Sequence, residues 1–187
     1  MPEYTSVEID EPIDWIVAES LMRNFVLKDA KLDFSSIKIF LSDVDGVMTD
    51  AGMYYTENGD EYKKFCAYDG MAMQLLQERG IKVGMLTSED KELNRRRAKK
   101  LNLDFDFHGV TDKLQTVKDL CKSEKITLNE VAYIGDDVNC FELLSNVGIA
   151  SCPQNSMKKI KSIPNIIQLT KSGGEGVVRE LVELILS

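Results

Sequence analysis

The sequence predicts an α/β fold: a Rossmann-like parallel sheet with helices on both of its faces. From residue 37 onward, short apolar runs of strand length alternate with stretches that have the period of amphipathic helices. Most of the apolar runs end in polar residues or glycine, where a connecting loop begins. This alternation is typical of βαβ units, in which successive strands run parallel and the helices cover the sheet.

Six apolar runs are predicted to be strands, at residues 37–44, 81–86, 105–108, 131–134, 147–150 and 166–169. A helix is predicted over residues 112–123, because apolar residues recur there with the spacing of one buried helix face. These apolar residues are Leu114, Val117, Leu120 and Cys121.

Two further helices are predicted from capping residues and apolar spacing. The first begins near Asp69, taken as its N-cap, and ends at Gly80, which suits a left-handed C-terminal cap. Its buried residues are expected to be Met71, Leu75 and Leu76. The last helix begins at about Gly176, and its buried residues are expected to be Val177, Leu181, Leu184 and Ile185.

A β-hairpin is predicted between the first strand and the first of these helices. Aromatic residues within residues 53–65 flank the pair Asn58-Gly59, which favours a tight hairpin turn. A loop after the first strand overhangs the carboxyl edge of a parallel sheet, where active sites lie in this fold class. We therefore expect the hairpin to form a flap beside the active site.

The chain is predicted to consist of an appended segment, residues 1–36, and one domain, residues 37–187. Its 187 residues, 43% of them hydrophobic, are enough for a domain with its own core. The net charge of −8 argues against sequence-independent nucleic-acid binding, and no apolar run approaches the roughly 20 residues of a membrane-spanning helix. The four cysteines lack CxxC pairing, and the N-terminus lacks a signal-peptide pattern. We expect a cytoplasmic protein with reduced thiols.

An acidic motif comes after the first predicted strand, where the apolar run leads into Asp43 and Asp45. Two carboxylates at positions i and i+2 project to the same side of an extended chain. Carboxylates held so close repel each other, so a cation is their natural neutraliser. Hard oxygen ligands favour Mg²⁺, which binds through few carboxylates together with substrate phosphate.

A second acidic pair, Asp136 and Asp137, comes after another predicted strand, so both clusters are expected to meet at the carboxyl edge of the sheet. Between them in the sequence lie Thr87 and Ser88, at the end of a third strand, and Lys113, at the start of a helix. Hydroxyl and ammonium groups are suited to holding phosphate oxygens and offsetting developing negative charge.

In this order, the motifs Asp-x-Asp, Thr/Ser, Lys and Gly-Asp-Asp resemble those of the haloacid dehalogenase phosphatase superfamily. The resemblance implies that Asp43 attacks phosphorus to form an aspartyl-phosphate. It also implies that Asp45 protonates the leaving oxygen and then activates water. Thr87 and Lys113 would bind the phosphoryl group. Asp43, the backbone carbonyl of Asp45, and Asp136 would hold magnesium.

Within this superfamily, the chain most resembles the sugar-acid phosphatase branch. The resemblance extends over about residues 37–187. The motifs that carry it are DVDGVMTD, GMYY, KKF, DGM, TSE, VTDK, GDDVN and GGEGVVRE. Members of this branch act on 3-deoxy-manno-octulosonate 8-phosphate or on nine-carbon nonulosonate 9-phosphates. The resemblance implies a phosphorylated sugar acid as substrate and a homotetramer joined through the flap hairpin.

The Thr/Ser motif, which is the second of the four motifs in the sequence, indicates the size of the substrate. Octulosonate enzymes of the branch usually carry Thr-Gly-Arg there, whereas Thr87, Ser88 and Glu89 are closer to the Thr-Gly-Glu of the nine-carbon type. We therefore expect a nonulosonate 9-phosphate, with the octulosonate 8-phosphate as the alternative. The branch places basic groups near the substrate carboxylate. Arg97 and Lys100, which share a helix face, are the candidates for this role, and a merely solvated face is the alternative. Glu89 is a third candidate for contact with the substrate.

The N-terminal segment points to the same chemistry. VEIDEPIDWIVAE, residues 7–19, resembles the closing segment of acylneuraminate cytidylyltransferases, some of which carry a phosphatase-like domain behind them. The chain therefore resembles the C-terminal part of such a fusion in sialic acid metabolism. One alternative is a non-catalytic oligomerisation domain of such an enzyme. A signalling receiver domain is less compatible, because receivers place their paired acids on the first strand and the phosphorylated Asp on a middle strand.

One position departs from the family pattern. The family commonly has Asp three residues after the second Asp of Gly-Asp-Asp, and this chain has Cys140 there. The expected ligands of the metal remain. The residues around these ligands are expected to hold them in place less firmly, because Cys140 replaces an Asp.

Overall fold

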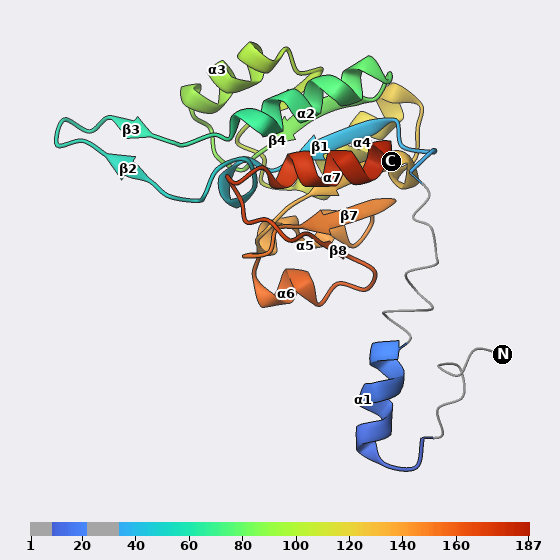
Figure 1. The fold of residues 1–187 in the computed structure, drawn as a ribbon. Helices are drawn as coiled ribbons and strands as arrows, with labels where there is room; N and C mark the ends of the chain where they lie inside the picture. Colours follow the sequence, from blue (N-terminus) through green and yellow to red (C-terminus); the bar gives the residue numbers. More distant parts are fainter. Residues whose placement is uncertain (1–8, 22–33) are drawn as a thin grey trace. The chain divides into compact units, whose positions relative to one another are not determined.

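The computed structural model of the protein describes residues 9–21 and 34–187 (Figure 1). The chain divides into two compact units at the bond between Asp33 and Phe34. In the first unit, helix α1 spans Pro12–Leu21, and the Asp14 carboxylate accepts the backbone N–H groups of Asp10 and Glu11 before the helix. The remainder of the appended segment that the sequence predicted lies largely outside the described residues.

The second unit is built on a parallel sheet of six strands in the order β5-β4-β1-β6-β7-β8. The strands are β1 (Ile39–Ser42), β4 (Lys82–Leu86), β5 (Phe105–Phe107), β6 (Val131–Ile134), β7 (Ile149–Cys152) and β8 (Ile167–Gln168). All five pairings are parallel, which confirms the predicted fold class. Strand β1 is central, so the loop after its last residue, Ser42, lies in the middle of the carboxyl edge.

Each predicted strand is present, but only the strand at residues 131–134 has the predicted bounds, and the other five differ by one or two residues at one or both ends. The first strand ends at Ser42, because the chain turns at Asp43 into a short helical segment, η3 (Val44–Met48). Strand β7 begins two residues later than predicted, because Gly148 donates its backbone N–H to the carbonyl of Leu128 before the strand begins.

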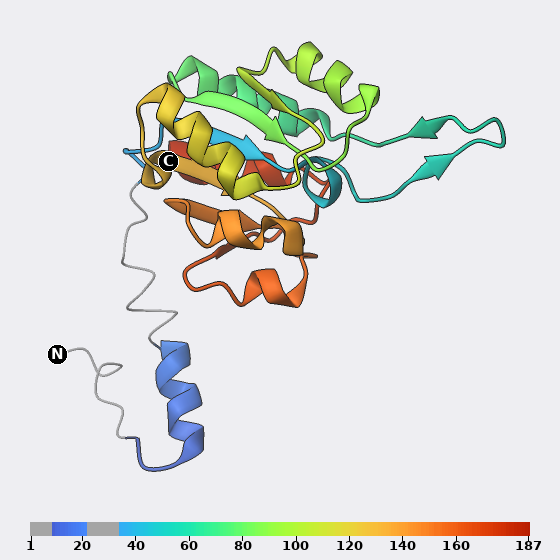
Figure 2. The same cartoon turned by 180° about the vertical axis from the view of Figure 1, so that it is seen from behind.

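The helices cover both faces of the sheet, as Figures 1 and 2 show from opposite sides. They are α2 (Ala67–Glu78), α3 (Glu92–Leu101), α4 (Lys113–Glu124), α5 (Phe141–Leu144), α6 (Lys158–Lys161) and α7 (Val177–Leu186), with the 3-10 turns η4 (Leu128–Glu130) and η5 (Val138–Cys140). Within the described residues, every helix is too short or too polar to span a bilayer.

The core has one half on each face, because successive side chains of a strand point in opposite directions. On β1, Phe40 packs in the cluster formed with α2 and α7. Its neighbours Ile39 and Leu41 pack in the second cluster with α4 and α5. All four residues of β1 are buried, which explains why this strand reads as a continuous apolar run.

For two helices, the predictions of the N-terminal cap or of the buried residues were partly wrong. Helix α2 begins at Ala67 with Cys66 as its N-cap, so Asp69 is not the cap. Asp69 is buried inside the first turn and accepts the backbone N–H of Arg179 at 3.0 Å, so it satisfies an N–H group in the first turn of α7 instead. Met71 in α2 and Leu184 in α7 were expected to be buried, but they are 51% and 40% exposed.

The predicted hairpin flap is present, with β2 (Tyr54–Tyr55) paired antiparallel to β3 (Glu61–Tyr62). Thr56 donates its backbone N–H to the carbonyl of Asp60, so the loop contains three residues and ends at Gly59 with a φ of 88°. A three-residue loop that ends in a left-handed glycine is a common hairpin connection. The hairpin extends away from the sheet in both views (Figures 1 and 2).

Candidate active site

A pocket of about 380 Å³ opens at the carboxyl edge of the sheet. It is lined by residues that come after β1, β4 and β6 and by two residues at the start of the flap. These residues are Asp43, Asp45, Ala51, Met53, Thr87, Ser88, Glu89, Asp136, Asp137, Val138 and Asn139. The structure therefore brings together both acidic clusters and the second motif, although about 90 residues of chain separate the first cluster from the last.

Asp43 stands directly after the central strand and is 4% exposed. One of its carboxylate oxygens accepts the backbone N–H of Val44 at 2.8 Å, and the other accepts the ammonium of Lys113 at 2.5 Å. These bonds fix the orientation of the carboxylate. Because the strand ends here, the side chain lies at the carboxyl edge rather than on a face of the sheet.

Lys113 reaches this carboxylate from the first turn of α4, where Asp112 caps the helix. Its ammonium also lies 3.2 Å from the hydroxyl of Tyr133 and 3.4 Å from the sulfur of Cys140. Burial lowers the pKa of Lys113, but interactions with Asp43 and Cys140 more than offset this effect, so the pKa is raised overall. Lys113 therefore stays protonated and keeps a positive charge beside Asp43.

Gly46 allows the two acidic clusters to approach each other. Its φ is +80°, and a Cβ atom built there would lie 1.9 Å from an oxygen of Asp136. A larger residue would force Asp136 away. Burial, with the charges of Asp43 and Asp137, raises the pKa of Asp136 to about 7. The site therefore carries negative charge that the side chains of the described residues do not fully neutralise.

This donor set fits Mg²⁺. Asp43 and Asp136 present carboxylate oxygens beside the backbone turn at Asp45, whose φ and ψ of −77° and 127° break the helical geometry of η3. Oxygen ligands, excess negative charge and an adjoining pocket wide enough for a phosphate are what a magnesium site for phosphoryl transfer requires. Asp43, the carbonyl of Asp45, and Asp136 are the residues that would hold the ion.

The second motif, Thr87 to Glu89, forms another part of the pocket wall. Thr87 is 2% exposed, and its hydroxyl accepts the backbone N–H of Glu89 at 3.2 Å. The Ser88 hydroxyl accepts the side-chain amide of Asn139 at 3.1 Å, which joins the loops after β4 and β6. Ser88 therefore supports the shape of the pocket in addition to offering a hydroxyl to it.

Sequence reasoning missed Lys63, which lies just after β3 at the base of the flap. Its side chain is fully covered, and its ammonium lies 2.8 Å from both carboxylate oxygens of Asp45 and also contacts Glu89. Burial lowers the pKa of Lys63, but the hydrogen bonds to these two carboxylates raise it overall. The only signal was the KKF motif, which carried the family resemblance without a role for either lysine.

The structure does not bring Arg97 and Lys100 into the pocket. The Arg97 guanidinium donates to the backbone carbonyl of Cys66 at 3.0 Å and lies over the ring of Phe65, 5.3 Å from its centre. Lys100 is exposed on α3 and is not among the lining residues. In this chain Arg97 supports the segment between the flap and α2. Glu89, the third candidate for substrate contact, does line the pocket.

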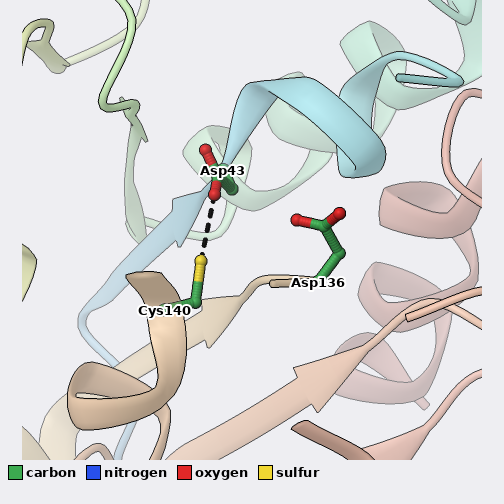
Figure 3. Close-up of side chains that lie close together, drawn as sticks. All are labelled: Asp43, Asp136 and Cys140. Atoms are coloured by element: carbon green, nitrogen blue, oxygen red, sulfur yellow. Dashed lines mark hydrogen bonds between the residues drawn. The ribbon is translucent and has the colours of Figure 1, made fainter. Parts of the chain in front are cut away.

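Cys140 lies directly behind the Asp43 carboxylate. Its sulfur is fully buried, donates to Asp43 at 3.0 Å and lies 3.1 Å from the Tyr133 hydroxyl. Burial, together with the charge of Asp43, raises the pKa of this thiol to about 12. Figure 3 shows the sulfur pointing toward Asp43, with the Asp136 carboxylate alongside.

A parallel sheet with a hydrogen-bonded aspartate after its central strand, a buried lysine and converging carboxylates is the arrangement of a phosphoryl-transfer hydrolase. Residues 86–181 match the family described as haloacid dehalogenase-like hydrolase. The chain belongs to this family, and within it to the phosphatases. The match distinguishes it from the signalling receiver domains.

Individual relatives agree with this assignment. The chain is 32% identical over 151 residues to the 3-deoxy-D-manno-octulosonate 8-phosphate phosphatase of Haemophilus influenzae, with 81% of this chain and 83% of the relative covered. The Escherichia coli K12 enzyme of the same name is 30% identical over 152 residues, with 81% and 80% covered.

A solved structure of the Moraxella catarrhalis enzyme of that name, in complex with magnesium, phosphate and KDO, superposes with a TM-score of 0.81 at 33% identity. It covers 86% of this chain and 91% of that one. The cobalt-bound Haemophilus influenzae structure gives 0.77 at 31% identity, with 82% and 89% covered.

Proposed function

We propose that this chain is a Mg²⁺-dependent phosphatase that removes the terminal phosphate from a 2-keto-3-deoxy sugar acid through an aspartyl-phosphate at Asp43. The observation that carries the proposal is the position of Asp43, held by Lys113 and Val44 at the floor of a pocket whose wall is the Thr87 loop. The octulosonate phosphatase relatives supply the class of substrate.

In the first step, an oxygen of Asp43 attacks phosphorus, and the bond between phosphorus and the sugar oxygen breaks. Asp45 gives a proton to the departing sugar oxygen. In the second step, Asp45 takes a proton from water as the water oxygen attacks phosphorus, which releases phosphate and restores Asp43. When bound, magnesium supplies positive charge beside the phosphoryl oxygens.

The other residues hold and position the reacting groups. Lys113 neutralises Asp43 and places positive charge near the phosphoryl group, and the Thr87 hydroxyl offers it a hydrogen bond. Lys63 fixes the Asp45 carboxylate from the flap side, so the acid and base group is held by a residue outside its own loop. The Asp45 carboxylate is also within 3.3 Å of the Thr49 hydroxyl.

The size of the substrate has two candidates, each with its own support. Glu89 at the third position of the second motif, with the N-terminal resemblance to acylneuraminate cytidylyltransferases, favours a nine-carbon nonulosonate 9-phosphate. The solved and curated relatives favour the eight-carbon 3-deoxy-manno-octulosonate 8-phosphate. Glu89 lines the pocket and is held by Lys63 and Asn94, which supports a role for its carboxylate in selecting among sugar hydroxyls.

We further propose a homotetramer joined through the flap. Met53, Tyr54, Tyr55 and Tyr62 are 44–66% exposed on this hairpin. A group of large apolar and aromatic side chains of this kind is typical of an interface. Light scattering of the protein and of a Tyr54→Ser, Tyr55→Ser variant tests this, and a wild-type mass of one chain contradicts it.

The test of the function is phosphate release from a nonulosonate 9-phosphate and an octulosonate 8-phosphate, measured side by side with Mg²⁺ and with EDTA. Hydrolysis of one of them that is lost with EDTA and in Asp43→Asn supports the proposal. The preferred substrate decides its size. Release from neither, with magnesium binding established by calorimetry, overturns the catalytic claim and favours the non-catalytic oligomerisation domain.

A further inference from the structure

Three side chains of different chemistry converge behind the pocket. Asp43, Asp136 and Cys140 each offer one ligand atom, and these atoms all lie within 4.8 Å of one another. Two are carboxylate oxygens and the third is a thiol sulfur, which lies 3.0 Å from the nearer oxygen of Asp43 (Figure 3). Only the sulfur departs from the oxygen set that suits Mg²⁺.

We propose that this cluster is also a site for a thiophilic divalent cation, zinc in particular, bound by the Cys140 sulfur together with Asp43 and Asp136. Zinc at this site competes with magnesium and stops the enzyme, because it occupies the nucleophilic carboxylate. The inhibition rests on the proposed function, whereas the binding does not.

The ligand set matches the preferences of zinc. Zinc in proteins takes sulfur, nitrogen and carboxylate ligands in four-coordinate geometry, at about 2.0 Å to oxygen and about 2.3 Å to sulfur. In that geometry, ligand atoms lie roughly 3.3 to 3.6 Å apart. The three atoms of the cluster all lie within 4.8 Å of one another, so small shifts of the side chains bring them to these separations. A water or a phosphate oxygen takes the fourth position.

The two cations differ in their preference for soft ligand atoms such as sulfur. Mg²⁺ takes oxygen ligands and gains nothing from a thiol, whereas thiolate ligands select zinc over magnesium. An Asp or Ser at this position would offer a hard oxygen, whereas Cys140 offers a soft sulfur. The Cys140 sulfur therefore raises affinity for zinc without helping magnesium.

The charges around the cluster also favour a divalent cation. On coordination the thiol releases its proton to solvent and binds as thiolate. Asp43, Asp136 and Cys140 then carry three negative charges, and the ammonium of Lys113, 3.4 Å from the sulfur, carries one positive charge. These four groups leave two negative charges, and Asp137 adds a further one beside Asp136, so the site attracts a divalent cation. Tyr133, whose hydroxyl lies 3.1 Å from the sulfur, can donate a hydrogen bond to the thiolate.

Access to the site is through the pocket. Asp43 and Asp136 line the pocket, whereas Cys140 is fully buried beneath them. A cation that enters therefore meets the two carboxylates first and the sulfur last. In the alternative interpretation, Cys140 only fills space and donates a hydrogen bond to Asp43, and the cation never reaches it.

The two interpretations differ in a spectroscopic measurement. Co²⁺ is added to metal-free protein, and the absorbance of the thiolate-to-cobalt charge-transfer band in the near ultraviolet is recorded. Wild type is expected to develop this band with one equivalent of Co²⁺, and added Zn²⁺ is expected to abolish it. Cys140→Ser and Cys140→Asp are expected to lack the band. Cys66→Ser, which removes the half-buried thiol elsewhere, is expected to keep it.

A second measurement gives the affinity. The affinity for Zn²⁺ is measured by competition with a chromophoric chelator. It is expected to be at least about tenfold weaker in Cys140→Asp, which is within the range seen when residues that hold metal ligands in place are changed. Circular dichroism verifies that each variant is folded. Absence of the cobalt band in wild type, or its persistence in Cys140→Ser, overturns the proposal. Because neither readout uses turnover, this failure is distinguishable from a failure of the phosphatase proposal.

Discussion

The ammonium of Lys63 lies 2.8 Å from both carboxylate oxygens of Asp45, although Lys63 belongs to the base of the flap and Asp45 to the turn after the central strand. The same ammonium contacts Glu89, which lies in the loop after β4. One ammonium therefore connects the flap, the Asp45 carboxylate and the second motif. In the proposed mechanism, this residue links the flap to proton transfer by Asp45.

Removal of this charge is expected to impair proton transfer more than binding. In Lys63→Met, we expect kcat for the sugar-acid phosphate to fall by about 10²-fold, a loss typical of a disturbed general acid or base, with a much smaller change in KM. Release of the first equivalent of p-nitrophenol from p-nitrophenyl phosphate is expected to stay close to wild type, because this leaving group needs no proton. Rapid-mixing kinetics measures both.

The matched control is Lys64→Met. Lys64 is the next residue, its side chain is 62% exposed, and its nearest carboxylate oxygen, on Asp50, is 3.7 Å away. Equal losses in the two lysine variants, or an equal loss with both leaving groups in Lys63→Met, contradict the role given to Lys63.

Gly46→Ala is expected to weaken magnesium binding. A Cβ at this position would lie 1.9 Å from Asp136, and the positive φ of 80° costs a non-glycine residue about 1 kcal/mol. We expect the Mg²⁺ concentration for half-maximal activity to rise by at least about tenfold as Asp136 moves away. Gly59→Ala has a similar φ of 88° with nothing within 4 Å, so it adds strain without crowding. If both variants respond alike, crowding of Asp136 is not the cause.

Asp69 is expected to make stability depend on pH. Burial raises its pKa from 3.8 to about 6, partly offset by the backbone N–H of Arg179. The folded state therefore holds this proton more tightly than the unfolded state, and the stabilisation is complete below pH 4 and lost as pH rises through 6. The difference of about two units corresponds to roughly 3 kcal/mol as an upper bound.

Urea unfolding of wild type and Asp69→Asn at about pH 4.5 and about pH 7.5, on either side of the raised pKa, measures this effect. The free energy of unfolding of wild type, relative to the variant, is expected to decrease between these pH values. Asp119→Asn on the exposed face of α4 is the control, and its difference from wild type is expected to change little. A relative stability of wild type that rises with pH contradicts the assigned environment of Asp69.

The sequence predicted those parts of the fold that depend on local patterns. Residues 131–134 form a strand with the predicted bounds, because a buried strand of a parallel sheet is apolar throughout. The buried face of α2 was partly wrong, because α7 packs on Ala72 and Met73 and leaves Met71 in solvent. Which side of an apolar helix is covered depends on a partner more than 100 residues away.

The candidate site also contains residues whose positions follow from local sequence patterns and residues whose positions do not. Asp43, Thr87, Lys113 and Asp136 come after strands or begin helices, so their meeting at one edge is a consequence of the topology. The position of Lys63 depends on how the flap folds back, and no local pattern encodes this. Arg97 satisfied the helix-face argument but is held by the Cys66 carbonyl, which only the packing of α3 on α2 reveals.

The central claim is that Asp43 becomes phosphorylated during turnover. The direct measurement mixes enzyme, Mg²⁺ and the preferred sugar-acid phosphate, quenches the reaction with acid within milliseconds and determines the mass of the intact protein. The account predicts a wild-type fraction heavier by one phosphoryl group, mapped by peptide analysis to Asp43, and no such species in Asp43→Asn. Turnover of substrate without any phosphorylated protein, or a phosphoryl group on another residue, would contradict it.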